Sequence, residues 1–115
     1  MKKQKLLLIE SYIYAKTLFI FTNNASIIFH DYSIHLSINN IKTKAKTLLD
    51  LCEKKIYELR LNNASFLILK KELESANEII DKTILLRKIN NLKDDYNYHF
   101  ENVKNISSWK SSYLL

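Results

Sequence analysis

The 115-residue chain contains neither glycine nor proline, and it has only one cysteine. Without glycine, the chain cannot form the glycine-rich loop that commonly cradles nucleotide phosphates. A single cysteine excludes a disulfide framework or a thiolate metal cluster within the chain. The absence of glycine and proline also removes the usual helix breakers. These absences argue against the common nucleotide-binding and disulfide-rich classes and favour long helices.

Arginine is also scarce, whereas Lys, Asn, Ile, Tyr and Phe are abundant. This is the amino-acid profile of an AT-rich coding sequence, so Ile, Tyr and Phe carry less information about strands than they usually do. Hydrophobic residues make up 47% of the chain, which is enough for the core of a single domain over residues 1–115. The net charge of +6 permits an anionic partner but does not identify one.

Apolar residues recur at alternating spacings of three and four from residue 34 onward. The first seam consists of Ile34, Ile38, Ile41, Ala45, Leu48 and Cys52, and it continues to Ile56 and Leu59. Later seams consist of Phe66, Leu69, Leu73, Ala76 and Ile80, and of Ile89, Leu92, Tyr96, His99, Val103 and Ile106. This spacing is typical of a helix that packs along its length on another helix. Because Asn62-Asn63 interrupts it, the pattern predicts an antiparallel hairpin of two helices, 34–61 and 64–110.

The pattern also changes phase between Ile80 and Leu85. A seam extended from Ile80 would bury Thr83 and Arg87, whereas the chain supplies apolar residues at other positions. With no glycine or proline nearby, we expect the 64–110 helix to continue through this point with a local change of supercoil.

Residues 1–33 form an apolar N-terminal segment that we expect to be an additional helix, covered by its own domain or by a partner. The pair Asn23-Asn24 and the alternation from Ser33 to Ile38 also fit a small antiparallel meander over 17–38. We therefore predict an all-α fold, a helical hairpin or coiled coil with an added N-terminal helix; an α+β fold with that meander is the alternative. We expect a partner to complete the packing at the apolar lead-in before Ile34 and at the phase change near Ile84.

The ionisable residues do not predict an enzyme, a cofactor site or a metal site. His30, Asp31 and His35 form a polar cluster that lacks a third metal ligand at suitable spacing, so we interpret it as a surface ion pair or a capping group. His99 stands on a seam and is expected to be an interfacial histidine. Cys52 also stands on a seam and is expected to be a buried, inert thiol.

Docking of a protein partner through apolar helical faces is the preferred function. Lys42 and Lys46 lie one helical turn apart and could contact phosphates, which makes a basic nucleic-acid-binding protein the alternative. Trp109 is either an anchor that closes the base of the hairpin or an interface residue. The candidate partner-binding residues are Asn62, Asn63, Phe66, Lys42, Lys46, Trp109 and Tyr113.

The expected location is the cytoplasm. The start, Lys2-Lys3-Gln4-Lys5 followed by four apolar residues, resembles a secretion signal, but Glu10 cuts the apolar run short. The longest uncharged stretch, 17–29, is shorter than the roughly 20 residues that a membrane-spanning helix needs.

Three features resemble the stalk subunits of type III secretion export ATPases. They are the long hairpin, the run Leu48-Leu49-Asp50-Leu51, and the aromatic end of the second helix, which runs from Phe100 to Trp109. The resemblance covers about 34–110; residues 6–38 are more apolar than is usual in that family. It implies a cytoplasmic antiparallel coiled coil without catalytic residues, which inserts into a hexameric ATPase ring as a rotor-like stalk and handles export chaperones. A generic helical adaptor and a small phage-type inhibitor protein are the alternatives.

Overall fold

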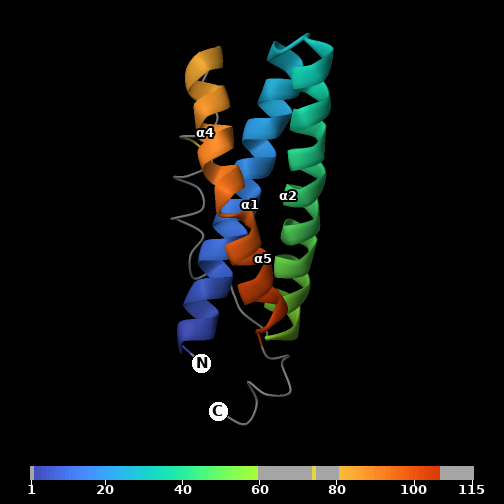
Figure 1. Cartoon of the computed structure of the whole chain (residues 1–115). Coiled ribbons are helices and arrows are strands. Elements are labelled where there is room, and N and C mark those ends of the chain that lie inside the picture. Colours follow the sequence, from blue (N-terminus) through green and yellow to red (C-terminus); the bar gives the residue numbers. More distant parts are fainter. Residues whose placement is uncertain (1, 60–73, 75–80, 107–115) are drawn as a thin grey trace.

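Figure 1 shows a computed structural model of the chain, which describes residues 2–59, 74 and 81–106. Over these residues the chain forms α1 (Lys2–Ile28), α2 (Tyr32–Glu58), α4 (Lys82–Asp94) and α5 (Tyr96–Lys104), and it forms no strand. Helices α1 and α2 run antiparallel and pack together as a hairpin, and α4 and α5 follow one another along it (Figure 1). The prediction of an all-α fold with a helical hairpin is therefore confirmed.

The alternative meander over 17–38 is wrong. Asn23 and Asn24 lie inside α1, and the alternating run from Ser33 to Ile38 lies inside α2. The chain reverses at 29–31, where Asp31 has an extended backbone and caps α2. Its Oδ1 accepts hydrogen bonds from the backbone N–H groups of Ser33 (3.0 Å) and Ile34 (3.2 Å). These N–H groups have no partner within the helix, so the Asp31 carboxylate defines where α2 begins.

The hairpin is formed by a different pair of helices from the one predicted. The expected partner of helix 34–61 was helix 64–110, but α2 packs more extensively on α1 than on α5. The N-terminal segment is thus one arm of the hairpin rather than an addition to it. The predicted turn at Asn62-Asn63 lies outside the described residues. A 3-4 seam shows that a helix packs on another helix but does not say which one, and this explains the error.

The expected continuity of helix 64–110 is also wrong. Asp81 has an extended backbone, with φ −75° and ψ 125°, and its Oδ1 accepts a hydrogen bond of 3.0 Å from the N–H of Ile84. A second interruption at Asp95 separates α4 from α5. An aspartate side chain competes for nearby backbone N–H groups, so it can begin a helix without help from glycine or proline. The break at Asp81 coincides with the phase change in the apolar pattern.

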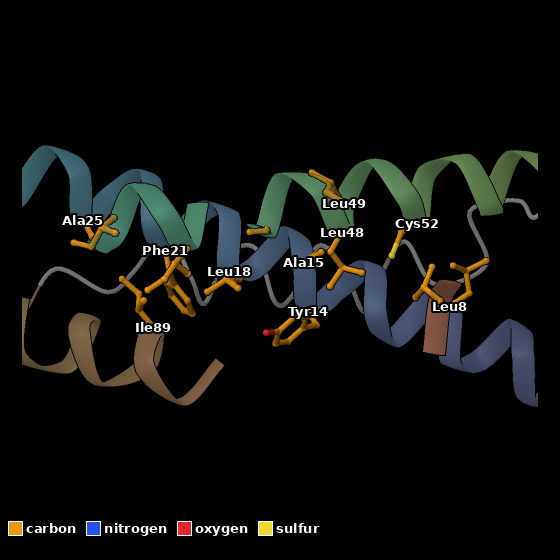
Figure 2. Close-up of a cluster of buried hydrophobic side chains, with 14 of the residues drawn as sticks. Leu8, Tyr14, Ala15, Leu18, Phe21, Ala25, Leu48, Leu49, Cys52 and Ile89 are labelled. Carbon is orange, nitrogen blue, oxygen red and sulfur yellow. The ribbon is translucent and has the colours of Figure 1, made fainter. Parts of the chain in front are cut away.

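The core lies along the α1–α2 contact and extends to α4 and α5. Figure 2 shows side chains of α1 and α2 pointing toward one another, with Ile89 of α4 beside Phe21 of α1. The first seam is confirmed, because its central members are buried on α2: Ile38, Ile41, Ala45, Leu48 and Cys52. The buried face of α1 consists of Leu8, Ser11, Tyr14, Ala15, Thr17, Leu18, Phe21, Thr22 and Ala25.

Candidate interaction surfaces

Most of the predicted partner-binding residues cannot be compared with the structure. Asn62, Asn63, Phe66, Trp109 and Tyr113 all lie outside the described residues.

The two remaining candidates, Lys42 and Lys46, each have a partner within the chain. The Nζ atom of Lys42 lies 5.7 Å from the centre of the Phe19 ring, in a cation–π contact. The Nζ atom of Lys46 lies 3.3 Å from Oδ1 of Asp50, in an exposed ion pair one turn along α2. Each of the two lysines thus has a contact within the chain, Lys42 with Phe19 and Lys46 with Asp50.

Within the polar cluster of His30, Asp31 and His35, Asp31 acts as the cap of α2. Besides the two backbone N–H groups, the hydroxyl of Ser33 donates to Oδ1 of Asp31 at 2.7 Å. This hydroxyl and the backbone donors hold the pKa of Asp31 below its usual value. The capping interpretation is therefore confirmed. Among the residues that the structure describes, no group of three or more His, Cys, Asp or Glu side chains could hold a metal ion.

Cys52 is fully buried on α2, as expected. Burial, with a smaller contribution from the charge of Glu53, raises the pKa of its thiol to about 12. A thiol with such a pKa carries almost no thiolate near neutral pH, so Cys52 contributes packing rather than reactivity.

His99 joins α5 to α1, which confirms its predicted position at a helix interface. Its Nδ1 lies 2.7 Å from Oγ of Ser11, and its ring stacks on the Tyr14 ring with centroids 4.3 Å apart. The hydroxyl of Tyr14 donates to the backbone carbonyl of Leu92 near the end of α4. Burial lowers the pKa of His99, and this effect is partly opposed by the carboxylates of Asp95 and Glu10.

The Ser11–His99 pair has the atoms of a nucleophile and a general base, but its setting does not suit catalysis. Ser11 is fully buried, so a substrate cannot reach its hydroxyl. The stacked Tyr14 ring and the short hydrogen bond instead fix the position of α5 against α1. The contact between Ser11, Tyr14, Leu92 and His99, called the His99 contact below, is structural.

Exposed apolar side chains gather where α1 turns into α2. Ile27, Tyr32 and Leu36 are 74%, 79% and 51% exposed, respectively. Tyr32 and Leu36 lie one turn apart on the same face of α2, and Ile27 lies in the last turn of α1. We call these three residues the turn-end patch. Ile27 and Tyr32 belong to the apolar lead-in before Ile34 where a partner was expected, whereas Leu36 follows it, and none of the three was among the candidate residues.

A groove of about 360 Å³ lies next to this turn, between Phe29 and one face of α4. The described residues that line it are Phe29, Lys82, Thr83, Leu86, Arg87, Asn90 and Asn91. Figure 1 shows the start of α4 at the same end of the molecule as the α1–α2 turn. A smaller hollow of about 230 Å³ lies near the α4–α5 junction. There Lys44 lies over the Tyr96 ring, with its Nζ atom 5.9 Å from the ring centre.

No family model, no curated protein and no solved structure matches this chain. No helix over the described ranges, 2–59 and 81–106, is long and apolar enough to cross a membrane.

Proposed function

We propose that this chain is a non-catalytic helical adaptor that binds a protein partner through the turn-end patch. The observation that carries the proposal is the exposure of Ile27, Tyr32 and Leu36 at one end of a helical hairpin. Aromatic and large aliphatic side chains are common at the centres of protein interfaces, where they fill pockets of the partner.

The local structure supports this role. Asp31 fixes the start of α2 through its two backbone hydrogen bonds, and Tyr32 and Leu36 follow within the first turns of that helix. Side chains held on a capped helix lose less conformational freedom on binding than side chains on a mobile loop. Tyr32 and Leu36 of the turn-end patch are therefore preorganised for docking.

The more specific form of the proposal is a stalk subunit of a type III secretion ATPase complex. Its support is the sequence resemblance described above, over Leu48-Leu49-Asp50-Leu51 and from Phe100 to Trp109. The hairpin in the fold joins α1 to α2 and is not the hairpin on which that resemblance drew. The partner would then be a hexameric ATPase or an export chaperone, and the chain would act in the cytoplasm. Nucleic-acid binding has less support, because Lys42 and Lys46 are engaged with Phe19 and Asp50.

A pair of matched double variants tests the proposal. Tyr32→Ser/Leu36→Ser removes two members of the turn-end patch. Leu6→Ser/Tyr57→Ser removes the same two residue types where they are 57% and 85% exposed, near the start of α1 and the end of α2. Both variants are expected to keep the wild-type far-ultraviolet circular dichroism spectrum, since no buried side chain changes.

The readout is quantitative co-purification from extracts of the native host. A partner recovered with the wild type and with the Leu6/Tyr57 variant should be reduced about tenfold or more with the Tyr32/Leu36 variant, because interface anchors typically contribute about 1 kcal/mol or more each. Equal recovery with both variants would contradict the proposed surface. Recovery of an ATPase or secretion components would support the stalk form, and recovery of nucleic acid alone would contradict the adaptor role.

A further inference from the structure

We propose that the groove between Phe29 and α4 binds an acidic peptide segment of the protein partner. In this arrangement an apolar side chain of the segment packs on Phe29 and Leu86, and its carboxylates pair with Lys82 and Arg87. The inference rests on the proposed adaptor function and deepens it, because it names the chemistry that the partner must carry.

The groove is built on a helix that is capped at its start and buried on its inner side. Along α4, Lys82, Leu86 and Asn90 follow one another at intervals of one turn, and Arg87 lies on the adjacent row. Leu85 and Ile89 on the inner side of α4 are fully buried and hold the helix against the core. The cap at Asp81 fixes the point at which α4 begins. The lining side chains therefore project from a well-supported helix.

The charges of the groove favour an anionic ligand. Its described lining includes two cations, Lys82 and Arg87, and no acidic residue. The salt bridges among the described residues join other pairs, Lys46–Asp50 and Lys55–Glu58, so neither groove cation has a carboxylate partner there. An arginine guanidinium can hold a carboxylate through two parallel hydrogen bonds, and complementary charges accelerate association and select the partner.

The remaining lining favours a peptide over a nucleic acid. Phe29 and Leu86 supply an apolar surface beside the cations, and a volume of about 360 Å³ lies within the range of ordinary ligand pockets. The carboxamides of Asn90 and Asn91 can both donate to and accept from a peptide backbone. A segment that alternates acidic and apolar residues satisfies all three kinds of lining group.

Selection from a phage-displayed library of random peptides tests the inference without knowledge of the partner. The full chain is immobilised as wild type, as Lys82→Glu/Arg87→Glu, and as Lys54→Glu/Lys104→Glu. The last variant changes the net charge by the same amount, at exposed positions on α2 and α5 that do not line the groove. Circular dichroism and thermal melting confirm that all three proteins are folded.

Peptides that combine acidic and apolar residues should be enriched on the wild type and on the Lys54/Lys104 variant. A synthetic peptide from this selection should bind the Lys82/Arg87 variant about tenfold or more weakly by fluorescence polarisation, and its binding to the wild type should weaken as salt is added. Phe29→Ala should weaken it as well.

Three outcomes would overturn the inference: no enrichment, enrichment of neutral or basic peptides, or equal losses in the two charge-reversed variants. A fluorescent DNA duplex that displaces the peptide and is itself sensitive to Lys82→Glu/Arg87→Glu would also overturn it, in favour of nucleic acid. Co-purification that is insensitive to Tyr32→Ser/Leu36→Ser refutes the adaptor surface, whereas failure of the peptide selection refutes only the groove. The two failures are therefore distinguishable.

Discussion

Replacing Tyr14 with phenylalanine tests the His99 contact, through which α1 holds the α4–α5 junction. Tyr14 is buried on α1, its hydroxyl donates to the backbone carbonyl of Leu92, and its ring stacks on His99. Tyr14→Phe removes the hydroxyl and keeps the ring. The expected loss in the free energy of unfolding is therefore that of one intramolecular hydrogen bond, about 1 kcal/mol.

The geometry around Leu92 sets an upper limit on this loss. The Leu92 carbonyl also accepts a hydrogen bond of 3.1 Å from the backbone N–H of Asp95. It therefore keeps one partner in Tyr14→Phe, and the larger penalty for an unsatisfied buried carbonyl does not apply. Tyr14→Ala also removes the ring and its stack on His99, and the cost should rise to about 3–5 kcal/mol.

The assay is urea denaturation followed by far-ultraviolet circular dichroism, with Tyr57→Phe as the matched control. Tyr57 is exposed on α2, so its substitution should change the free energy of unfolding by less than about 0.5 kcal/mol. If Tyr14→Phe were as neutral as Tyr57→Phe, the hydroxyl would not stabilise the junction. A loss close to that of Tyr14→Ala would show that the substitution disrupts more than one hydrogen bond.

Three further predictions concern a helix cap, the core and pH. Asp81→Ala should lower the free energy of unfolding by about 1 kcal/mol in urea denaturation, because it removes the side-chain hydrogen bond that caps α4. Asp95→Ala removes no side-chain cap hydrogen bond, so it should lower the free energy of unfolding clearly less. In the same assay Leu48→Ala should cost about 2–5 kcal/mol at a fully buried position, against less than about 0.5 kcal/mol for exposed Leu36→Ala. Burial lowers the pKa of His99 in the folded state below its unfolded-state value near 6.5. The stabilisation that His99 contributes is therefore complete above this unfolded-state pKa, and it is lost as the pH falls from there toward the folded-state pKa. Thermal melts between about pH 5 and about pH 7.5 should thus depend less on pH in His99→Gln than in the wild type, and equal dependence would contradict this assignment.

The helical fold and the buried face of α2 were predictable from sequence because apolar periodicity is a local property. Residues such as Ile41 and Leu48 recur at helical spacing, and the structure buries them. The periodicity also placed His99 at an interface. Asn62-Asn63, on which the predicted hairpin turn depended, lies outside the described residues.

The pairing of the helices was not predictable in the same way. The buried face of α1 includes small or polar side chains such as Ser11, Ala15 and Thr22, which do not stand out in an apolar pattern. Thr22 satisfies its buried hydroxyl by donating to backbone carbonyls of its own helix, at 3.0 Å to Leu18 and 2.9 Å to Phe19. A residue of this kind can lie in the core, but its type alone does not predict this.

Aspartate residues, rather than glycine or proline, lie at the helix boundaries. Both Asp31 and Asp81 have extended backbones and cap the helices that follow them. Asp95, between α4 and α5, differs from them because its backbone is helical and its side chain makes no cap hydrogen bond. Asp50 shows why residue type alone is insufficient, since it lies inside α2 and pairs with Lys46. An aspartate marks a boundary when its carboxylate reaches free backbone N–H groups, and that depends on where the preceding helix has ended.

The two capped boundaries also explain why both proposed binding features occur at the same end of the molecule. The cap at Asp31 starts α2 beside the exposed Tyr32, and the cap at Asp81 starts α4 beside Lys82 in the groove. Figure 1 shows these two helix starts close to the same end of the hairpin. The His99 contact, at the α4–α5 junction, holds α4 along α1 and thereby keeps the groove next to the turn. Apolar side chains at the turn and cations along α4 thus form adjacent surfaces, and an acidic, partly apolar partner segment would complement both.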